Sequence, residues 1–277
     1  MTSRTLTSSA AGPMTIDATL AGVGGTITVR AAADCERATL TISTAAESGP
    51  SADAVRNATL QQEAGSLIAN VQASTGAVSA GRGVYQSAVS NSGTIIQVAG
   101  NVIGGDLNIG GGGLRYPGAA VSADRIDIVA TVPEGSSVDV RTQSADVRVD
   151  GAVVSVGAAT VSGGIRIGLA EEIAATTVSG DIELGRTDMV EASTTSGDIT
   201  IRDFGGTARL KAVSGDITVH AAAGGNVHAA TVSGDIRVTA TQEALDDDLD
   251  VRTNSVSGDI TVPAGRPRTS QPRRRRS

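Results

Sequence analysis

The sequence predicts an all-β chain: a right-handed parallel β-solenoid with coils of about 18 residues, preceded by an irregular N-terminal β region. Three observations support this prediction. A short word recurs at nearly constant spacing, the residues after each copy alternate between apolar and polar, and aromatic residues make up only 1% of the chain. Because compact cores rely on the large buried area of aromatic side chains, their scarcity favours a thin aliphatic interior.

The repeated word is Ser-Gly-Asp-Ile, and its copies set the length of a coil. Successive serines are separated by 17 to 19 residues, and by 24 residues in the last interval: Ser144 and Ser162 in two degenerate copies, then Ser179, Ser196, Ser214, Ser233 and Ser257. A unit of this length cannot bury its apolar side alone, so the copies must stack and share one core. Parallel crossovers are right-handed in nearly all proteins, which predicts the hand.

Each unit is expected to contain two short strands. After the aspartate, Ile217-Thr218-Val219 alternates as a half-buried strand does, and before the serine a second alternation has small inward residues. Paired glycines such as Gly224-Gly225 predict turns between the strands. The word itself allows two arrangements: a continuous strand through Gly215, or a bend there that places serine and aspartate at a corner, where they can bond backbone amides.

The chain divides into four predicted segments. Residues 1–13 are expected to be disordered, and residues 14–120 to form the irregular β region, with a glycine-rich insertion at 74–113. Residues 121–263 should form the solenoid, and residues 264–277 a disordered arginine-rich tail. Pro263 and Pro267 should blunt that end of the stack, because proline cannot extend a hydrogen-bonded ladder.

The repeats, together with residues 126–140 that lead into them, resemble the bacterial putative-adhesin family of β-strand-repeat proteins, a family of unknown function. The resemblance is close over residues 121–262 and weaker over residues 14–43. It implies a β-repeat domain to which no catalytic residues can be assigned.

Cysteine content, apolar segments and charge limit the compartment and the partners. Cys35 is the only cysteine, which excludes an intramolecular disulfide framework. No apolar segment is long enough for a secretory signal or a membrane span, so we expect a cytoplasmic protein without membrane insertion. The formal net charge is −7 although six arginines lie within residues 266–277, so only this tail is expected to attract nucleic acid.

The aspartates of the repeated word are the most suggestive candidate site. Stacked about 4.8 Å apart, neighbouring carboxylates would repel by about 3.5 kcal/mol at an effective dielectric constant of 20. The favoured explanation is that turn amides or water stabilise them; the alternatives are calcium between coils and the acid–base pair of a carbohydrate-cleaving β-helix enzyme. The ladder comprises Asp181, Asp198, Asp216 and Asp235, with Asp146 and Asp259 at its ends.

Three other clusters carry weaker signals. His220 and His228 could approach each other, but a zinc site would need a third ligand. The glycine-rich residues 104–106 and 110–113 lack the lysine and the following helix of a phosphate-binding loop. The long last interval contains acidic residues that we expect to pair with the arginine-rich tail: Glu243, Asp246, Asp247, Asp248 and Asp250.

The leading functional prediction is a non-enzymatic structural or interaction module that needs no cofactor. It would present a long flat face to an unknown protein partner or associate with itself. The alternative from another class is a self-assembling cytoskeletal scaffold similar to the bactofilins, because the open ends of a solenoid are exposed sheet edges.

Overall fold

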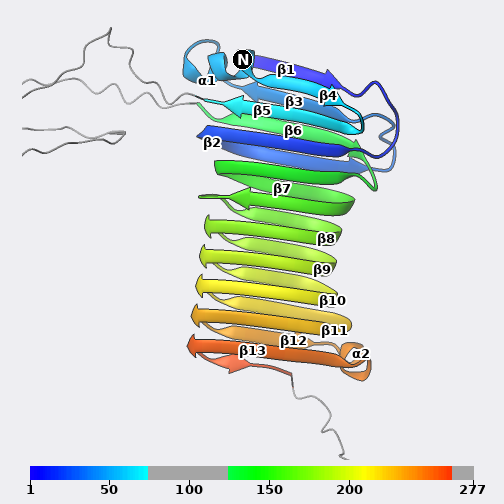
Figure 1. Ribbon diagram of the computed structural model, residues 1–277, viewed down its shortest axis with the longest axis vertical. Coiled ribbons are helices and arrows are strands. Elements are labelled where there is room, and N and C mark those ends of the chain that lie inside the picture. Colours follow the sequence, from blue (N-terminus) through cyan, green and yellow to red (C-terminus); the bar gives the residue numbers. More distant parts are fainter. Residues whose placement is uncertain (74–123, 264–277) are drawn as a thin grey trace, which may run out of the picture.

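The computed structural model describes residues 1–73 and 124–263, which form a rod of stacked strands with a broader cap at one end (Figure 1). The strands are β1 (Thr2–Thr7), β2 (Thr15–Ala32), β3 (Thr39–Thr44), β4 (Thr59–Glu63), β5 (Ser66–Gln72), β6 (Ile126–Pro133), β7 (Ser137–Thr160), β8 (Ile165–Ser179), β9 (Ile182–Ser196), β10 (Ile199–Ser214), β11 (Ile217–Ser233), β12 (Ile236–Ala240), β13 (Leu249–Ser257) and β14 (Ile260–Thr261). Two short helices, α1 (Pro50–Asn57) and α2 (Gln242–Asp246), interrupt the otherwise β chain.

Parallel, in-register pairing of successive strands builds the rod. The order β2-β7-β8-β9-β10-β11 follows the chain, and the next coil is divided between β12 and β13. The isoleucines of the repeated word occupy one register position, in the order Ile165, Ile182, Ile199, Ile217, Ile236 and Ile260. The first five are fully buried, so the predicted stacking into one apolar column is confirmed.

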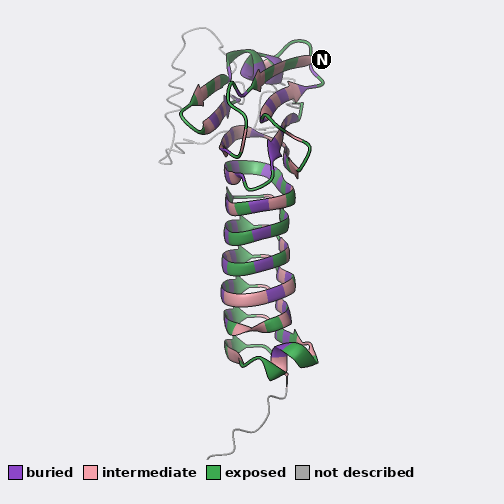
Figure 2. Cartoon of the chain, turned by 90° about the vertical axis from the view of Figure 1, so that its right-hand side faces the viewer, coloured by how far each residue is buried: buried purple, intermediate pink, exposed green. Residues whose placement is uncertain are grey.

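Each coil contributes one segment to each of two faces that enclose the core. The isoleucine face contains the segments that follow each Ser-Gly-Asp word, such as residues 199–201. The alanine face contains the segments that precede the word, such as residues 207–214, whose inward side chains are Ala208, Leu210 and Ala212. Buried and exposed residues alternate along both segments, as Figure 2 shows around the rod.

The repeated word forms a corner, which resolves the choice left open by the sequence. Strands end at the serine and resume at the isoleucine, and Gly215 between them has a φ of +154°. Val213, Ser214 and Asp216 are exposed, whereas Ile217 is buried. The strand therefore bends at the glycine instead of running through it. At the opposite corner most strands turn without a break.

The N-terminal end of the rod is capped by antiparallel strands. Strand β1 pairs with β3, β3 pairs with β6, and β4 pairs with β5, while α1 packs against β1, β3 and β5. The expectation that residues 1–13 are disordered is therefore wrong for residues 2–7, which form β1. Leu6 is the only apolar residue of this strand, so the sequence lacks the alternation of apolar and polar residues that predicts a strand.

The parallel stack begins earlier than residue 121, where the sequence placed its start. Strand β2 pairs in parallel with β7 along both faces, from Thr15 opposite Ser137 to Arg30 opposite Asp150. It is therefore a complete coil, although it lacks the repeated word and turns at a glycine-containing segment around Gly22. The predicted insertion at 74–113 and the tail at 264–277 lie outside the described residues. Neither described helix is long and apolar enough to span a membrane.

Candidate functional site

The aspartates of the repeated word form a hydrogen-bonded ladder along one corner of the rod. The Oδ1 atom of Asp181 accepts the backbone N–H of Asp198 at 3.0 Å, and Asp198 in turn accepts that of Asp216 at 2.8 Å. The same bond links each remaining pair, at 2.7 Å from Asp235 to Asp216 and at 2.8 Å from Asp259 to Asp235. At the start of the ladder, Asp146 accepts the N–H of Gly164 at 2.9 Å.

These contacts explain how like charges can be stacked. Each carboxylate except that of Asp259, the last in the row, has one oxygen bound to an amide of the next coil, and all are exposed to water, so both hydrogen bonding and hydration offset the repulsion. A calcium site would need several oxygen ligands converging on one point. Among residues 1–73 and 124–263, no group of three or more His, Cys, Asp or Glu side chains is placed to hold a metal ion.

The two histidines of the sequence lie on different faces of the rod. His220 is opposite Thr239 on the isoleucine face, and its Nδ1 atom lies 2.9 Å from the Thr239 hydroxyl. His228 is opposite Arg252 on the alanine face. The idea that they approach each other is therefore wrong, because the chain turns a corner between them.

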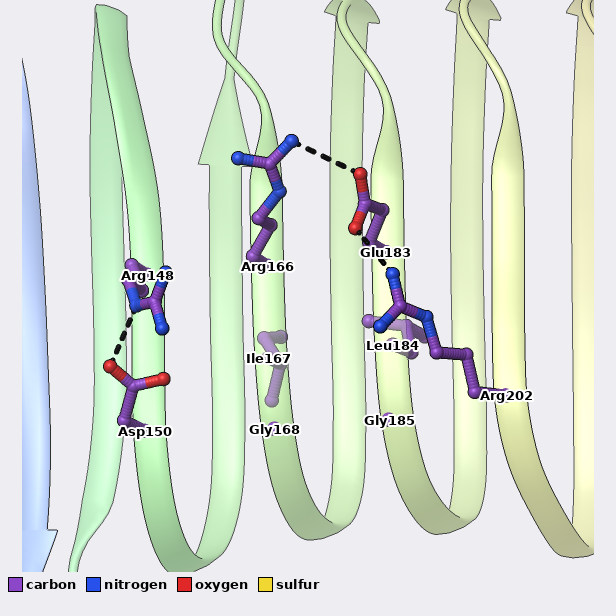
Figure 3. Close-up of a pocket in the computed structure, with 9 residues that line it drawn as sticks. All are labelled: Arg148, Asp150, Arg166, Ile167, Gly168, Glu183, Leu184, Gly185 and Arg202. Atoms are coloured by element: carbon purple, nitrogen blue, oxygen red, sulfur yellow. Dashed lines mark hydrogen bonds and ion pairs between the residues drawn. The ribbon is translucent and has the colours of Figure 1, made fainter.

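A charged hollow of about 380 Å³ lies on the isoleucine face, across β7, β8, β9 and β10 (Figure 3). Its rim carries three guanidinium groups. Arg148 and Arg166 occupy the same register position in neighbouring coils, and Arg202 comes from β10. No pattern in the sequence predicted this cluster. The signal was the second residue after the corner, which is arginine in two neighbouring coils, after Asp146 in one and after Gly164 in the next.

Two carboxylates hold these arginines in place. Glu183 accepts hydrogen bonds from Arg166 at 3.1 Å and from Arg202 at 3.0 Å, and Asp150 accepts one from Arg148 at 2.7 Å. The hydrogen bond to Glu183 and its charge raise the pKa of Arg166, and Asp150 raises the pKa of Arg148 in the same way. Each guanidinium has five N–H donors, so most of its donors remain available to a ligand.

Two glycines line the floor of the hollow. Gly168 follows the inward residue Ile167, at a position where a strand would normally carry an outward side chain. At Gly168 a Cβ atom would have only the Val149 carbonyl oxygen nearby, at 3.5 Å, so a side chain can begin there. At Gly185 a Cβ atom would overlap the carbonyl oxygen of Gly168, so only position 168 can carry a side chain into the hollow.

A second concave surface, of about 330 Å³, lies on the alanine face near the other end of the rod. We call it the basic groove and define it by Arg209, Lys211, His228 and Arg252. Arg209, His228 and Arg252 share one register position in three successive coils. Beside Lys211, the small side chain of Ala230 leaves room between the cationic groups.

The last interval between words forms helix α2 and a turn at the end of the rod. Asp248 adopts a positive φ of +57°, and Thr241 caps the helix by accepting the N–H of Ala244 at 3.2 Å. Glu243, Asp246, Asp247 and Asp248 are exposed there. Their predicted pairing with the arginine-rich tail cannot be compared with the structure, because the tail lies outside the described residues. The glycine-rich residues 104–106 and 110–113 also lie outside them.

A family model shows the family of the chain, and a solved structure shows a similar fold. The family model described as Toastrack DUF4097 matches residues 38–203 and 186–277. A crystal structure of a putative adhesin from Bacteroides fragilis is similar with a TM-score of 0.50 and 13% identity, covering 94% of this chain and 97% of that one. A putative lipid binding protein and a putative adhesin, both from Parabacteroides distasonis, have TM-scores of 0.40 and 0.38 at 12% identity, and each match covers 94% of this chain and 97% of the other. No curated protein matches.

Proposed function

The chain belongs to the Toastrack DUF4097 family, and on this premise we propose that it is a non-enzymatic interaction module, a stiff rod that presents a charged face to a protein partner. The observation that carries this proposal is the hollow on the isoleucine face. Glu183 and Asp150 hold its arginines by ion pairs, and the strands that carry them are fixed by backbone hydrogen bonds to neighbouring coils. The guanidinium groups are therefore already positioned before a partner binds.

The chemistry of the hollow favours binding over catalysis. Both of its carboxylates are bound to guanidinium groups, whereas a glycoside hydrolase needs one carboxylic acid free to donate a proton. Five carboxylates of the aspartate ladder, all but Asp259, have the same limitation, because each accepts an amide N–H of the next coil. Arginine is instead enriched in protein interfaces, where its planar group binds carboxylates in pairs of hydrogen bonds.

The cap argues against the bactofilin-like scaffold. End-to-end polymerisation requires an exposed sheet edge at each end of the rod. At the N-terminal end, antiparallel strands and α1 cover the stack instead. We propose a module that does not form filaments, and negative-stain microscopy showing filaments of purified protein would favour the scaffold.

We also propose that the coils, of about 18 residues each, wind in the right-handed sense. The support is general: parallel strands joined by short crossovers take this hand in about 98% of cases.

Site-specific photo-cross-linking in the source organism tests the proposed function. A photoreactive residue at Thr200, which is opposite Glu183, would lie beside the hollow. We expect adducts with another protein that are lost in a Gly168→Leu background, since leucine fills the hollow. The matched control is the same residue at Thr176 on the alanine face, where Gly168→Leu should leave any adduct unchanged. Adducts that persist with Gly168→Leu, or adducts only between copies of this chain, would refute the proposal.

A further inference from the structure

We propose that the basic groove on the alanine face binds the acidic side of a helix in a partner protein; this inference rests on the proposed function. The groove is a cationic surface on a chain with a formal net charge of −7. It lies on the opposite face from the charged hollow. The rod would thereby have a second, chemically distinct binding surface.

The cations of the groove are largely free to bind a ligand. Arg252 forms one ion pair, with Asp250 at 3.1 Å. Within the described part of the chain, Arg209 and Lys211 form no ion pair and no side-chain hydrogen bond, and both are exposed. The three arginines of the hollow, by contrast, are all paired with carboxylates. Glu191 is opposite Arg209 in the preceding coil, but among the described residues the two form no ion pair, so the groove has the less compensated positive charge.

The surroundings of the groove favour a narrow ligand over a broad anionic surface. On one side, the corner carries Asp216, Asp235 and Asp259; on the other, the turn after α2 carries Asp247 and Asp248. A flat anionic membrane pressed against this face would meet both acidic edges and be repelled. Nucleic acid is disfavoured by the same charges and by the absence of a Phe, Tyr or Trp side chain in the groove for bases to stack on.

The spacing of the three basic residues distinguishes a helix from an extended segment. Arg209, His228 and Arg252 lie in three successive coils, so the outer two are about 9.6 Å apart at a strand spacing of 4.8 Å. Residues i and i+7 of a helix are separated by about 10.5 Å along its axis, with i+3 or i+4 between them on the same side. Residues i and i+4 of an extended peptide are about 13 Å apart. Glutamates at i, i+4 and i+7 of a helix therefore match the three coils.

Strand addition within the groove is also disfavoured by hydrogen bonding. The backbone groups of β10 and β11 are directed along the sheet and pair with the coils on both sides, and those of β13 pair with β11, which leaves only the outer edge of β13 open. Only side chains face outward, so a partner must bind through its own side chains. An acidic helix supplies them in a row.

Fluorescence anisotropy with the full chain tests the proposal. The probe is a labelled helical peptide with glutamates at i, i+4 and i+7, and the control peptide has the same composition with the glutamates on different sides. At low salt, we expect the aligned peptide to bind at least about tenfold tighter, and Arg209→Glu combined with Lys211→Glu to remove that preference. Arg30→Glu combined with Arg237→Glu, on the isoleucine face outside the hollow, is the matched double charge reversal and should leave this binding unchanged.

Three results would contradict the proposal that the groove binds an acidic helix. Equal affinity for both peptides, or no loss with the Arg209→Glu and Lys211→Glu variant at an unchanged melting temperature, would overturn the helix assignment. Tighter binding of polygalacturonate or single-stranded DNA than of the aligned peptide would also overturn it and assign the groove to another anion. Any of these failures leaves the cross-linking test at Thr200 standing, because that test reports on the other face.

Discussion

At each Ser-Gly-Asp corner, glycine is required both by the backbone conformation and by the neighbouring coil. Gly215 has a φ of +154°, in a region that residues with a side chain rarely adopt. A Cβ atom there would also overlap the carbonyl oxygen of Gly197 in the preceding coil. The same overlap recurs at Gly197 with Gly180 and at Gly234 with Gly215. Glycine in the repeated word is thus a packing requirement, not a sign of flexibility.

Gly215→Ala should therefore lower the free energy of unfolding by about 1–3 kcal/mol, the usual cost of a strained backbone position. Gly168→Ala is the matched control. Its Cβ would be 3.5 Å from its nearest neighbour and its φ is not in the left-handed region, so a gain of about 0.5 kcal/mol is expected. Urea denaturation measures both, and equal effects would contradict the packing requirement.

The aspartate ladder gives a second prediction. Asp198→Ala removes the acceptor for the Asp216 N–H, so we expect a loss of about 0.5–1.5 kcal/mol in unfolding free energy. Asp198→Asn keeps an acceptor oxygen and removes one charge from a row of like charges, so stability should be unchanged or higher. If thermal melting shows that asparagine destabilises as much as alanine, the hydrogen bond is not what keeps aspartate at the corner.

At the scale of the strands, periodicity was sufficient to predict the repeat region. The alternation Ile217-Thr218-Val219 predicted which residues face inward, and Ile217 and Val219 are fully buried. The spacing of the word predicted the isoleucine column, because a short unit can be buried only by its copies.

The remaining features depend on contacts between distant segments. Strand β2 was not recognised as a coil because its corner lacks the repeated word, and the pairing of β1 with β3 depends on neighbours that no local pattern specifies. The charged hollow also depends on register. Arg202 is 19 residues from Glu183 in the chain and 3.0 Å from it in space. The position of Arg202 is not distinctive in the sequence until the coils are aligned.

Ile217→Asp tests the assignment of faces. A buried, unpaired carboxylate costs several kcal/mol, so this variant should unfold the rod or a section of it. The side chain of the next residue, Thr218, points outward, so Thr218→Asp should change the melting temperature little. Circular dichroism melts compare the two, and similar losses would mean that the faces are wrongly assigned.

At the scale of the whole molecule, the rod is a series of equivalent coils. Each coil contacts mainly its two neighbours, so the stability of the rod should be close to a sum over coils and their interfaces. At the N-terminal end, β5 and β6 pair with the terminal coil β2, and β3, β1 and α1 lie beyond them. Such a molecule should tolerate the removal of a complete coil but not of part of one.

Deleting residues 199–216 joins Asp198 to Ile217 and restores the word, so Ile217 would stack on Ile182. We expect a cooperatively folded rod that is about 4.8 Å shorter. Deleting only residues 199–207 would place an alanine-face segment on the isoleucine face and should prevent folding of the coils beyond it. Circular dichroism and small-angle scattering distinguish the two, and a folded product from the shorter deletion would contradict the equivalence of coils.

The most direct test of the in-register stack is a set of distances along one column of outward residues. Successive coils place Arg148, Arg166, Glu183, Thr200, Thr218, Arg237 and Thr261 at one register position. In a Cys35→Ser background, a spin label at position 148 is combined with a second label at 218, 237 or 261, and double electron–electron resonance measures their distance. The expected backbone separations are about 19, 24 and 29 Å. Separations that do not increase by about one strand spacing per coil would contradict the stack.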